Sequence, residues 1–198
     1  MRERGPYTKG IERREQILDA ALRTIAECGF LSTSVAELAD AVGLTPSGLL
    51  HYFGSKEDLF LAVLRRRSQL DLASVGLDPA SVGLETNPDP NYIAVIENST
   101  TVPGLTELFT HMQAAAADHR HPAHAYMVEH YEQSSAIVTG VLQRMQDNGI
   151  LSATADIGSL ATQAIALMDG LQSRWLIDPT IDMAAELERF WQIAIKGA

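Results

Sequence analysis

Histidine and carboxylate side chains, which are common zinc ligands in proteins, gather in one stretch of this sequence. The stretch holds the histidines His111, His119, His121, His124 and His130, with Asp118 and Glu129 beside them. A His-x-x-Glu-His sequence or two histidines four residues apart would favour a zinc site, and neither occurs here. His119 and His121 also fall in an expected loop between helices. We therefore predict no metal ion and no cofactor.

A second candidate for chemistry is a short polar face between residues 45 and 51. If Leu49 points inward on a helix here, the outward face presents Thr45, Pro46, Ser47, Gly48 and His51. Small residues let a helix enter the major groove of DNA, which is about 12 Å wide. Ser, Thr and His side chains can then reach base edges or phosphates. The pattern favours a DNA-reading surface, and the alternative is an ordinary exposed face of a helical bundle.

Two short helices are predicted to hold this face in place. Ser34 with Glu37 forms a capping box that opens the first of them. Gly43 suits the left-handed turn that follows it. Thr45 caps the second helix, whose first position is Pro46.

The spacing of small and apolar residues separates this pair from helix pairs that never touch DNA. A helix-turn-helix needs a small residue where the helices cross, here Ala39, and a glycine at the turn four residues later, here Gly43. It also needs apolar inner faces, and these are supplied by Leu38, Val42, Leu44, Leu49 and Tyr52. Residues 34 to 53 therefore predict a helix-turn-helix.

The rest of the chain repeats apolar residues at spacings of three and four, which is typical of helices. Helices are expected at about residues 10–28, from Ser55 onward, around 105–112, at 122–147, at 157–176 and after Asp182. Residues 74–91 are rich in Gly, Pro, Asn and Asp and predict a loop. We predict an all-α protein of about nine helices. Residues 1–55 form a three-helix DNA-binding domain and residues 56–198 a larger helical domain, with helix 56–73 connecting the two.

The net charge of −10 argues at first sight against a nucleic-acid partner. However, residues 1–67 hold ten Lys/Arg and nine Asp/Glu, a net of +1, whereas residues 68–198 hold five and sixteen, a net of −11. The acidic residues therefore belong mainly to the second domain. A basic N-terminal arm could follow a phosphate backbone, although a solvated terminus is the simpler alternative for Arg2, Arg4, Lys9, Arg13 and Arg14.

No apolar run approaches the length of a membrane span, and no secretory signal is visible, so we expect a soluble cytoplasmic protein. The single cysteine, Cys28, lies in an apolar helical pattern. We expect a reduced, packed thiol without a functional role.

The stretch from Arg13 to Leu64, above all LADAVGLTPSGLLHYFGSKEDLF, resembles the DNA-binding domain of the TetR (tetracycline repressor) family of bacterial regulators. The resemblance implies that the recognition helix runs from Pro46 to Tyr52. It also implies phosphate contacts by Lys56 and, at the start of the preceding helix, by Thr33 and Ser34. We expect the Tyr52 ring to pack inward while its hydroxyl reaches a phosphate. Many relatives carry Tyr where this chain has Leu50, which we expect to pack or to contact a thymine methyl group.

The second domain resembles the dimerisation and ligand-binding domain of one TetR-type subgroup, in the segments HPAHAYMVEHYE, ALMDG and DGLQSRWLIDPTIDM. The two last helices would pack against their two-fold mates. The expected dimer residues are Leu160, Ala164, Leu167, Leu171, Leu187, Phe190, Trp191 and Ile195, and burial within one chain is the alternative. The expected pocket residues, each of which could equally be core, are Phe109, Met112, Tyr126, Met127, His130, Met168 and Trp175.

The leading hypothesis is a homodimeric, non-enzymatic transcriptional repressor that binds a palindromic DNA operator and is released by a small-molecule effector through a population shift. The alternatives are a helical metal-dependent enzyme that uses the histidine cluster and a protein-binding adaptor with a non-functional helix-turn-helix. The sequence does not encode the effector, the operator, the target genes, the sign of regulation, or whether the pocket is open without a ligand.

Overall fold

The structure is a computed structural model that describes residues 6–74 and 100–197. Every regular element in these ranges is a helix, so the predicted all-α class is confirmed. The helices are α1 (Pro6–Cys28), α2 (Val35–Ala41), α3 (Pro46–His51), α4 (Lys56–Ser74), α6 (Pro103–Ala115), α7 (Pro122–Asp147), α8 (Ile157–Ile177) and α9 (Met183–Gly197). The loop predicted at 74–91 lies, from residue 75 onward, outside the described residues, as do Arg2 and Arg4 of the basic arm.

Local hydrogen bonds define the starts of α2 and α3 where the sequence predicts them. The Ser34 hydroxyl accepts a bond from the Glu37 backbone N–H at 3.2 Å, and the Glu37 carboxylate accepts one from the Ser34 N–H at 2.7 Å. The Thr45 hydroxyl accepts a bond from the Gly48 N–H at 3.1 Å. Gly43, with φ of +67°, makes the turn between the two helices in a conformation that strains other residues.

One apolar cluster holds the first three helices together. The buried face of α1 consists of Ile17, Leu18, Ala21 and Ile25. Leu38 and Ala39 of α2 and Leu49 of α3 pack into the same cluster, and all three are fully buried. The short helices α2 and α3 are stabilised chiefly by this packing, because isolated helices of their length are unstable in water.

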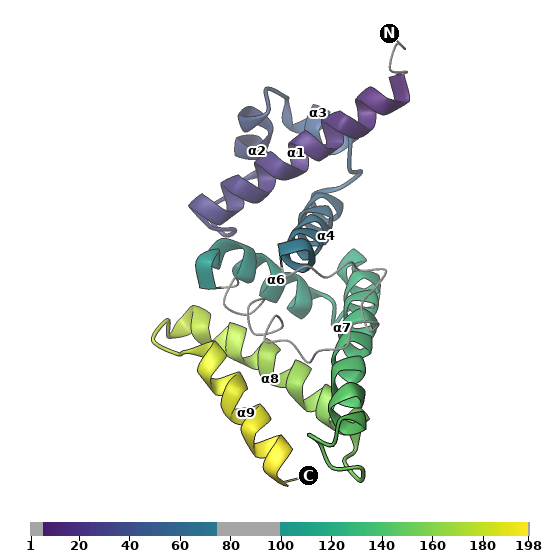
Figure 1. Ribbon diagram of the computed structural model, residues 1–198. Coiled ribbons are helices and arrows are strands. Elements are labelled where there is room, and N and C mark those ends of the chain that lie inside the picture. The colour runs from purple at the N-terminus through teal and green to yellow at the C-terminus, as the bar shows by residue number, and fades with distance from the viewer. Residues whose placement is uncertain (1–5, 75–99, 198) are drawn as a thin grey trace.

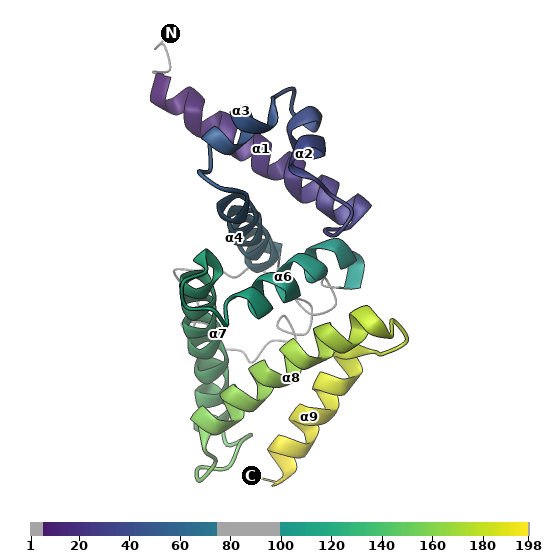
Figure 2. The same cartoon turned by 180° about the vertical axis from the view of Figure 1, so that it is seen from behind.

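The second part of the chain is a bundle of longer helices below the helix-turn-helix (Figure 1). Helix α4 enters this bundle, and α6 packs against α1, α4, α7 and α8. Helices α8 and α9 lie side by side at the opposite end of the molecule from α3, as the view from behind also shows (Figure 2). Leu142 and Ala164 centre one further apolar cluster, and Leu171, Met183 and Leu187 centre another.

Helix α6 is tied closely to the end of α1. A side chain at Gly104 would place its Cβ 2.0 Å from the carbonyl oxygen of Ile25 and 2.8 Å from the Cα of Gly29, so only glycine fits there. The Glu107 carboxylate accepts a hydrogen bond from the Phe30 N–H at 3.1 Å. A movement of α6 would therefore act directly on the base of the domain formed by α1, α2 and α3.

The expectation of a packed Cys28 is wrong. Its side chain is a free thiol exposed to solvent in the last turn of α1. By helical spacing position 28 continues the buried face of α1, but it is the last residue of the helix. The chain turns away at Gly29, with φ of +84°, and returns to the core with Phe30, which leaves the thiol at the open end of that face.

Candidate nucleic-acid interface and ligand site

Helix α3 presents a small polar face to solvent. Thr45, Pro46, Ser47 and His51 are exposed, and Gly48 is half-buried. The opposite side is anchored by Leu49, which is fully buried, and by Leu50, which packs against the core. The residues expected to read DNA therefore share one accessible surface, and Leu50 has the packing role expected of it.

The hydroxyl groups at the start of α3 are held in a local network. Besides capping Gly48, the Thr45 hydroxyl lies 3.2 Å from that of Ser47. His51 closes the helix, and its ring meets the Tyr52 ring edge-on with centroids 6.4 Å apart. Both ends of the face are thus oriented before any partner binds, which reduces the entropy cost of recognition.

The four expected phosphate contacts differ in accessibility. Lys56, at the first position of α4, is exposed, and its ammonium lies 5.4 Å from the centroid of the Phe60 ring. Ser34 is exposed and Tyr52 is half-buried. Thr33 is buried, and its hydroxyl donates to the Gly29 carbonyl at 2.6 Å. Its side chain therefore stabilises the turn after α1, which does not support a direct phosphate contact.

Two arginines assigned to the basic arm have structural contacts that sequence reasoning missed. The Arg13 guanidinium donates to the carbonyl of Val42, the residue that ends α2. The Arg14 guanidinium lies 4.8 Å from the centroid of the Phe53 ring, a cation–π geometry. The first contact links α1 to the turn between α2 and α3, and the second links α1 to the end of the helix-turn-helix. The sequence offers no local signal for them, because the partners lie about 30 to 40 residues away.

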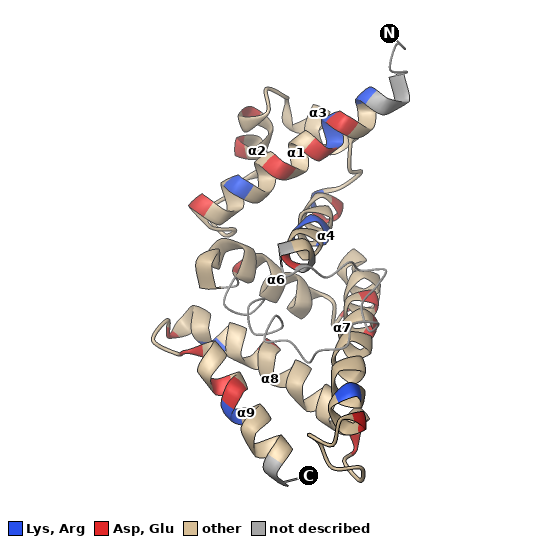
Figure 3. Ribbon diagram, viewed as in Figure 1, with Lys and Arg blue, Asp and Glu red and all other residues tan. Residues whose placement is uncertain are grey.

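Charges around α3 are sparse and mixed (Figure 3). The exposed basic side chain nearest in sequence is Lys56 on α4, followed by Arg65 on α4 and Arg23 on α1. The Glu37 carboxylate is held in the capping box, and the Ser34 hydrogen bonds lower its pKa. Each chain therefore offers few positive charges that attract phosphates. Two chains bound together to one DNA duplex would have a substantially higher affinity for it than a single chain.

The histidines of the sequence cluster have different surroundings. His119 and His121 lie in the turn before α7, where the His121 ring caps the helix. The ring of His124 contacts a backbone carbonyl at the end of α6 at 2.9 Å, and that of His111 packs against an aromatic ring of the α1–α2 turn. Among the described residues, no three His, Cys, Asp or Glu side chains come together as a possible metal site.

The residues expected to line a pocket divide between two places. Met112, Tyr126 and Met127 are buried in the main core, and the His130 ring stacks on Tyr126 and meets Phe109 edge-on at 5.1 Å. Burial in this aromatic group lowers the pKa of His130. Met168 and Trp175 instead pack near α9. The seven residues therefore lie in two parts of the bundle.

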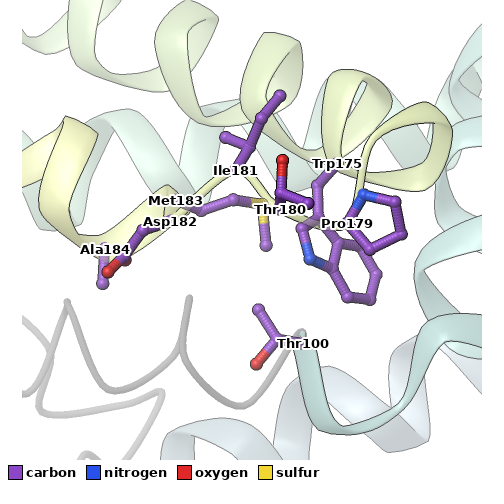
Figure 4. A pocket seen from close by; sticks show the side chains of 8 residues that line it. All are labelled: Thr100, Trp175, Pro179, Thr180, Ile181, Asp182, Met183 and Ala184. Atoms are coloured by element: carbon purple, nitrogen blue, oxygen red, sulfur yellow. The ribbon is translucent and has the colours of Figure 1, made fainter.

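A cavity of about 320 Å³ does lie beside Trp175, between the turn joining α8 to α9 and the start of α6 (Figure 4). Its wall consists of Thr100, Trp175, Pro179, Thr180, Ile181, Asp182, Met183 and Ala184. The Trp175 indole and the Met183 thioether supply an apolar surface, and Thr100 faces them across the opening. A volume of this size suits a small organic molecule. Only Trp175 was expected from the sequence.

A polar node joins α6, α7 and α8 inside the bundle. The Gln113 amide donates to the Tyr131 hydroxyl at 2.6 Å, and that hydroxyl donates to the Asp169 carboxylate at 2.7 Å. Burial raises the pKa of Tyr131 to about 12, so the phenol keeps its proton at neutral pH. Burial also raises the pKa of Asp169, although the bonds from Tyr131 and Gln113 oppose this. Sequence reasoning missed the node. The feature that could have revealed it is Asp169, the only acidic residue of α8.

The expected dimer residues also divide. Ala164, Leu171 and Leu187 are buried within the single chain, so these three need no partner to leave water. Leu160, Leu167, Phe190, Trp191 and Ile195 are half-buried. Exposed apolar side chains occur elsewhere on the same helices, at Ile177 and Ile193, and small exposed residues lie on α8 at Ala166 and Gly170. Within the described ranges, no helix combines the length and apolar character needed to cross a membrane.

Comparison with known proteins connects this geometry to a family. The family model described as "Bacterial regulatory proteins, tetR family" matches residues 17–63, which include α2, α3 and the start of α4. The HTH-type transcriptional regulator BetI of Brucella anthropi is 38% identical over 85 residues. That alignment covers 42% of this chain and 42% of the relative, so the similarity spans less than half the length of the curated relative.

Solved structures share the whole fold. A TetR transcription regulator from Haloarcula marismortui superposes with a TM-score of 0.69 at 19% identity, over 93% of this chain and 95% of that one. A structure from Saccharomonospora viridis, in complex with choline, gives a TM-score of 0.70 at 22% identity, over 91% and 96% of the two chains. The fold similarity therefore extends beyond the matched N-terminal segment into the helical bundle.

Proposed function

Because the chain belongs to the TetR family of bacterial regulatory proteins, we propose that it is a transcriptional regulator that binds duplex DNA through α3. The observation that carries the proposal is the exposed face of α3, where Ser47 and His51 are accessible while Leu49 anchors the helix in the core. Helix-turn-helix proteins place such a helix in the major groove. The location of the DNA makes the cytoplasm the expected compartment.

The finer proposal is a homodimer on a palindromic operator. One six-residue helix reads few base pairs, so a two-fold pair of such helices supplies the specificity that one chain lacks. Support for the dimer comes from α8, in which Asp169 and Arg174 are the only charged residues (Figure 3). With Ile177 and Ile193 exposed nearby, α8 and α9 carry apolar surface that a second copy would cover.

Release by a small molecule is the last part of the proposal. The cavity beside Trp175 opens next to the start of α6, and α6 contacts the end of α1 through Gly104 and Glu107. A ligand that favours another position of α6 would change the placement of the two α3 helices relative to each other. Repression, as in the leading hypothesis from the sequence, is the proposed effect of DNA binding on transcription.

Selection of duplex fragments from a random pool tests the DNA-binding proposal. The purified full chain is expected to enrich a two-fold symmetric sequence whose half-sites lie whole helical turns apart. The selection is run at low salt, where phosphate attraction is least screened, because the domain has few exposed cations to supply that attraction. Failure to enrich any palindrome under these conditions would contradict the proposal and favour a protein-binding adaptor.

A substitution at Gly170 tests the dimer. A Cβ at this position meets no atom within 4 Å, so Gly170→Gln fits the single chain and adds helix propensity. At the proposed interface the same side chain would hold the partner helix away, and we expect at least about a tenfold weaker dimer. Sedimentation equilibrium measures this, with Ala136→Gln on the exposed side of α7 as the control. An unchanged dimer in the Gly170 variant would place the interface elsewhere.

A further inference from the structure

Asp169 is a half-buried acid that lacks a positive partner among the described residues. Its bonds come from a phenol and, through Gln113, from an amide, both of which are neutral. Another half-buried acid of the bundle, Asp71, forms an ion pair with Arg67 at 3.2 Å. Burying a carboxylate without a cation is costly, so Asp169 is a site at which a positive charge would be strongly stabilised.

Gln172 supplies a second acceptor one turn further along α8. Its amide oxygen is buried and accepts no hydrogen bond from the described residues. Positions three apart on a helix are neighbours on its surface, so the Asp169 carboxylate and the Gln172 amide belong to adjacent positions of α8. A buried acceptor without a donor costs free energy comparable to a lost hydrogen bond. A ligand group that suits both Asp169 and Gln172 is therefore positively charged and also carries N–H donors.

Trp175 extends the same row of α8 toward the cavity. At a rise of 1.5 Å per residue, it lies about 9 Å along the helix axis from Asp169. Its indole forms part of the cavity wall (Figure 4). A molecule with an ammonium group at one end and an apolar or aromatic body at the other would span this distance, and its body would pack on the indole.

We propose that Asp169 and Gln172 bind the ammonium group of a protonated primary or secondary amine whose apolar body extends toward Trp175. This rests on the proposed ligand-responsive function and adds the chemical class of the ligand. Quaternary ammonium ions satisfy the charge of Asp169 but cannot donate to Gln172. Anions and neutral molecules lack the positive charge that Asp169 requires.

The node also connects this site to the DNA-binding domain. An ammonium bound to Asp169 competes with the Tyr131 hydroxyl, which in turn holds Gln113 of α6. Loss of the bond from Tyr131 to Asp169 releases Tyr131 and, with it, Gln113 in the C-terminal half of α6. The other end of α6 contacts α1 at Gly104. Binding of the amine is therefore expected to weaken the hold on α6 and to lower DNA affinity.

Calorimetric titration with three matched probes tests the proposal on the full chain. The probes are 2-phenylethylamine, its trimethylammonium analogue and 2-phenylethanol, which share one aromatic body. We expect the amine to bind about tenfold more tightly than the quaternary ion, and the alcohol to bind most weakly. Equal binding of the alcohol and the amine would overturn the proposal, as would equal binding of the two cations or no binding of the amine at millimolar concentration.

Two variants locate the site. Asp169→Asn should weaken amine binding by at least about tenfold, while Glu132→Gln, an exposed charge change beside Tyr131, should leave it unchanged. Gln172→Met should remove the preference for the amine over the quaternary ion. This second variant still tests the proposal if the Asp169 variant does not fold. Wild-type affinity in both variants would overturn the assignment. DNA selection by the ligand-free protein is scored separately, so failure of the amine site and failure of the regulator are distinguishable.

Discussion

Gly104→Ala is expected to lower the free energy of unfolding by about 3 kcal/mol, the cost of forcing extra volume into a packed contact. The new methyl carbon would lie 2.0 Å from the carbonyl oxygen of Ile25, and a backbone atom cannot move aside as a side chain can. In a chain of this length, that corresponds to a melting temperature lower by about 6 to 12 °C. Thermal unfolding followed by circular dichroism measures the change.

Gly10→Ala is the matched control for this substitution. Gly10 is also helical, but a Cβ there meets no atom within 4 Å. The control variant should be as stable as the wild type or more so, because alanine favours the helix. Equal stability of the two variants would show that α6 does not lie against α1 as described. The proposed route from the regulatory domain to α3 would then lose its basis.

Ser47→Glu is expected to reduce DNA affinity on the order of a hundredfold without loss of stability. The side chain lies in the first turn of α3 on the face assigned to DNA, where a carboxylate would meet phosphates of the same charge. An acid in the first turn of a helix is itself stabilising, so folding is preserved. Fluorescence anisotropy with a selected duplex measures the affinity, and thermal unfolding measures the stability.

Ser159→Glu makes the same chemical change in the first turn of α8, far from α3 (Figure 1). Its net charge equals that of the Ser47 variant, so it controls for a general electrostatic effect on DNA binding. We expect wild-type affinity for the selected duplex. A similar loss in both variants would assign the effect to net charge and would remove the evidence that α3 lies in the groove.

Local sequence signals predicted the helix-turn-helix well because its elements begin with side chains that bond within three residues. The Ser34 and Thr45 caps and the glycine turn at Gly43 are of this kind. The sequence could not show that Thr33 turns inward to the Gly29 carbonyl or that Arg13 reaches α2. The Thr33 contact depends on the shape of the turn after α1, and the Arg13 contact depends on how separate helices pack; apolar periodicity determines neither.

The bundle formed by α4 and α6 to α9 was less predictable for the same reason. Apolar stripes on α8 and α9 indicated burial but not the partner, and Ala164 and Leu187 proved to be buried within one chain. The expected pocket residues were likewise divided between the main core and the region near α9. Asp169 was the visible exception to an apolar helix, but its contacts with Tyr131 and Gln113 come from two other helices.

The central claim, that α3 reads the DNA sequence, is tested most directly by repeating the random-pool selection with His51→Ala beside the wild type. His51 is exposed on α3 and has a ring that can bond a base edge. We predict that both proteins enrich a palindrome of the same half-site spacing, and that the variant loses base preference at one position in each half-site. Identical preferences at every position, or no enriched palindrome for the wild type, would contradict the claim.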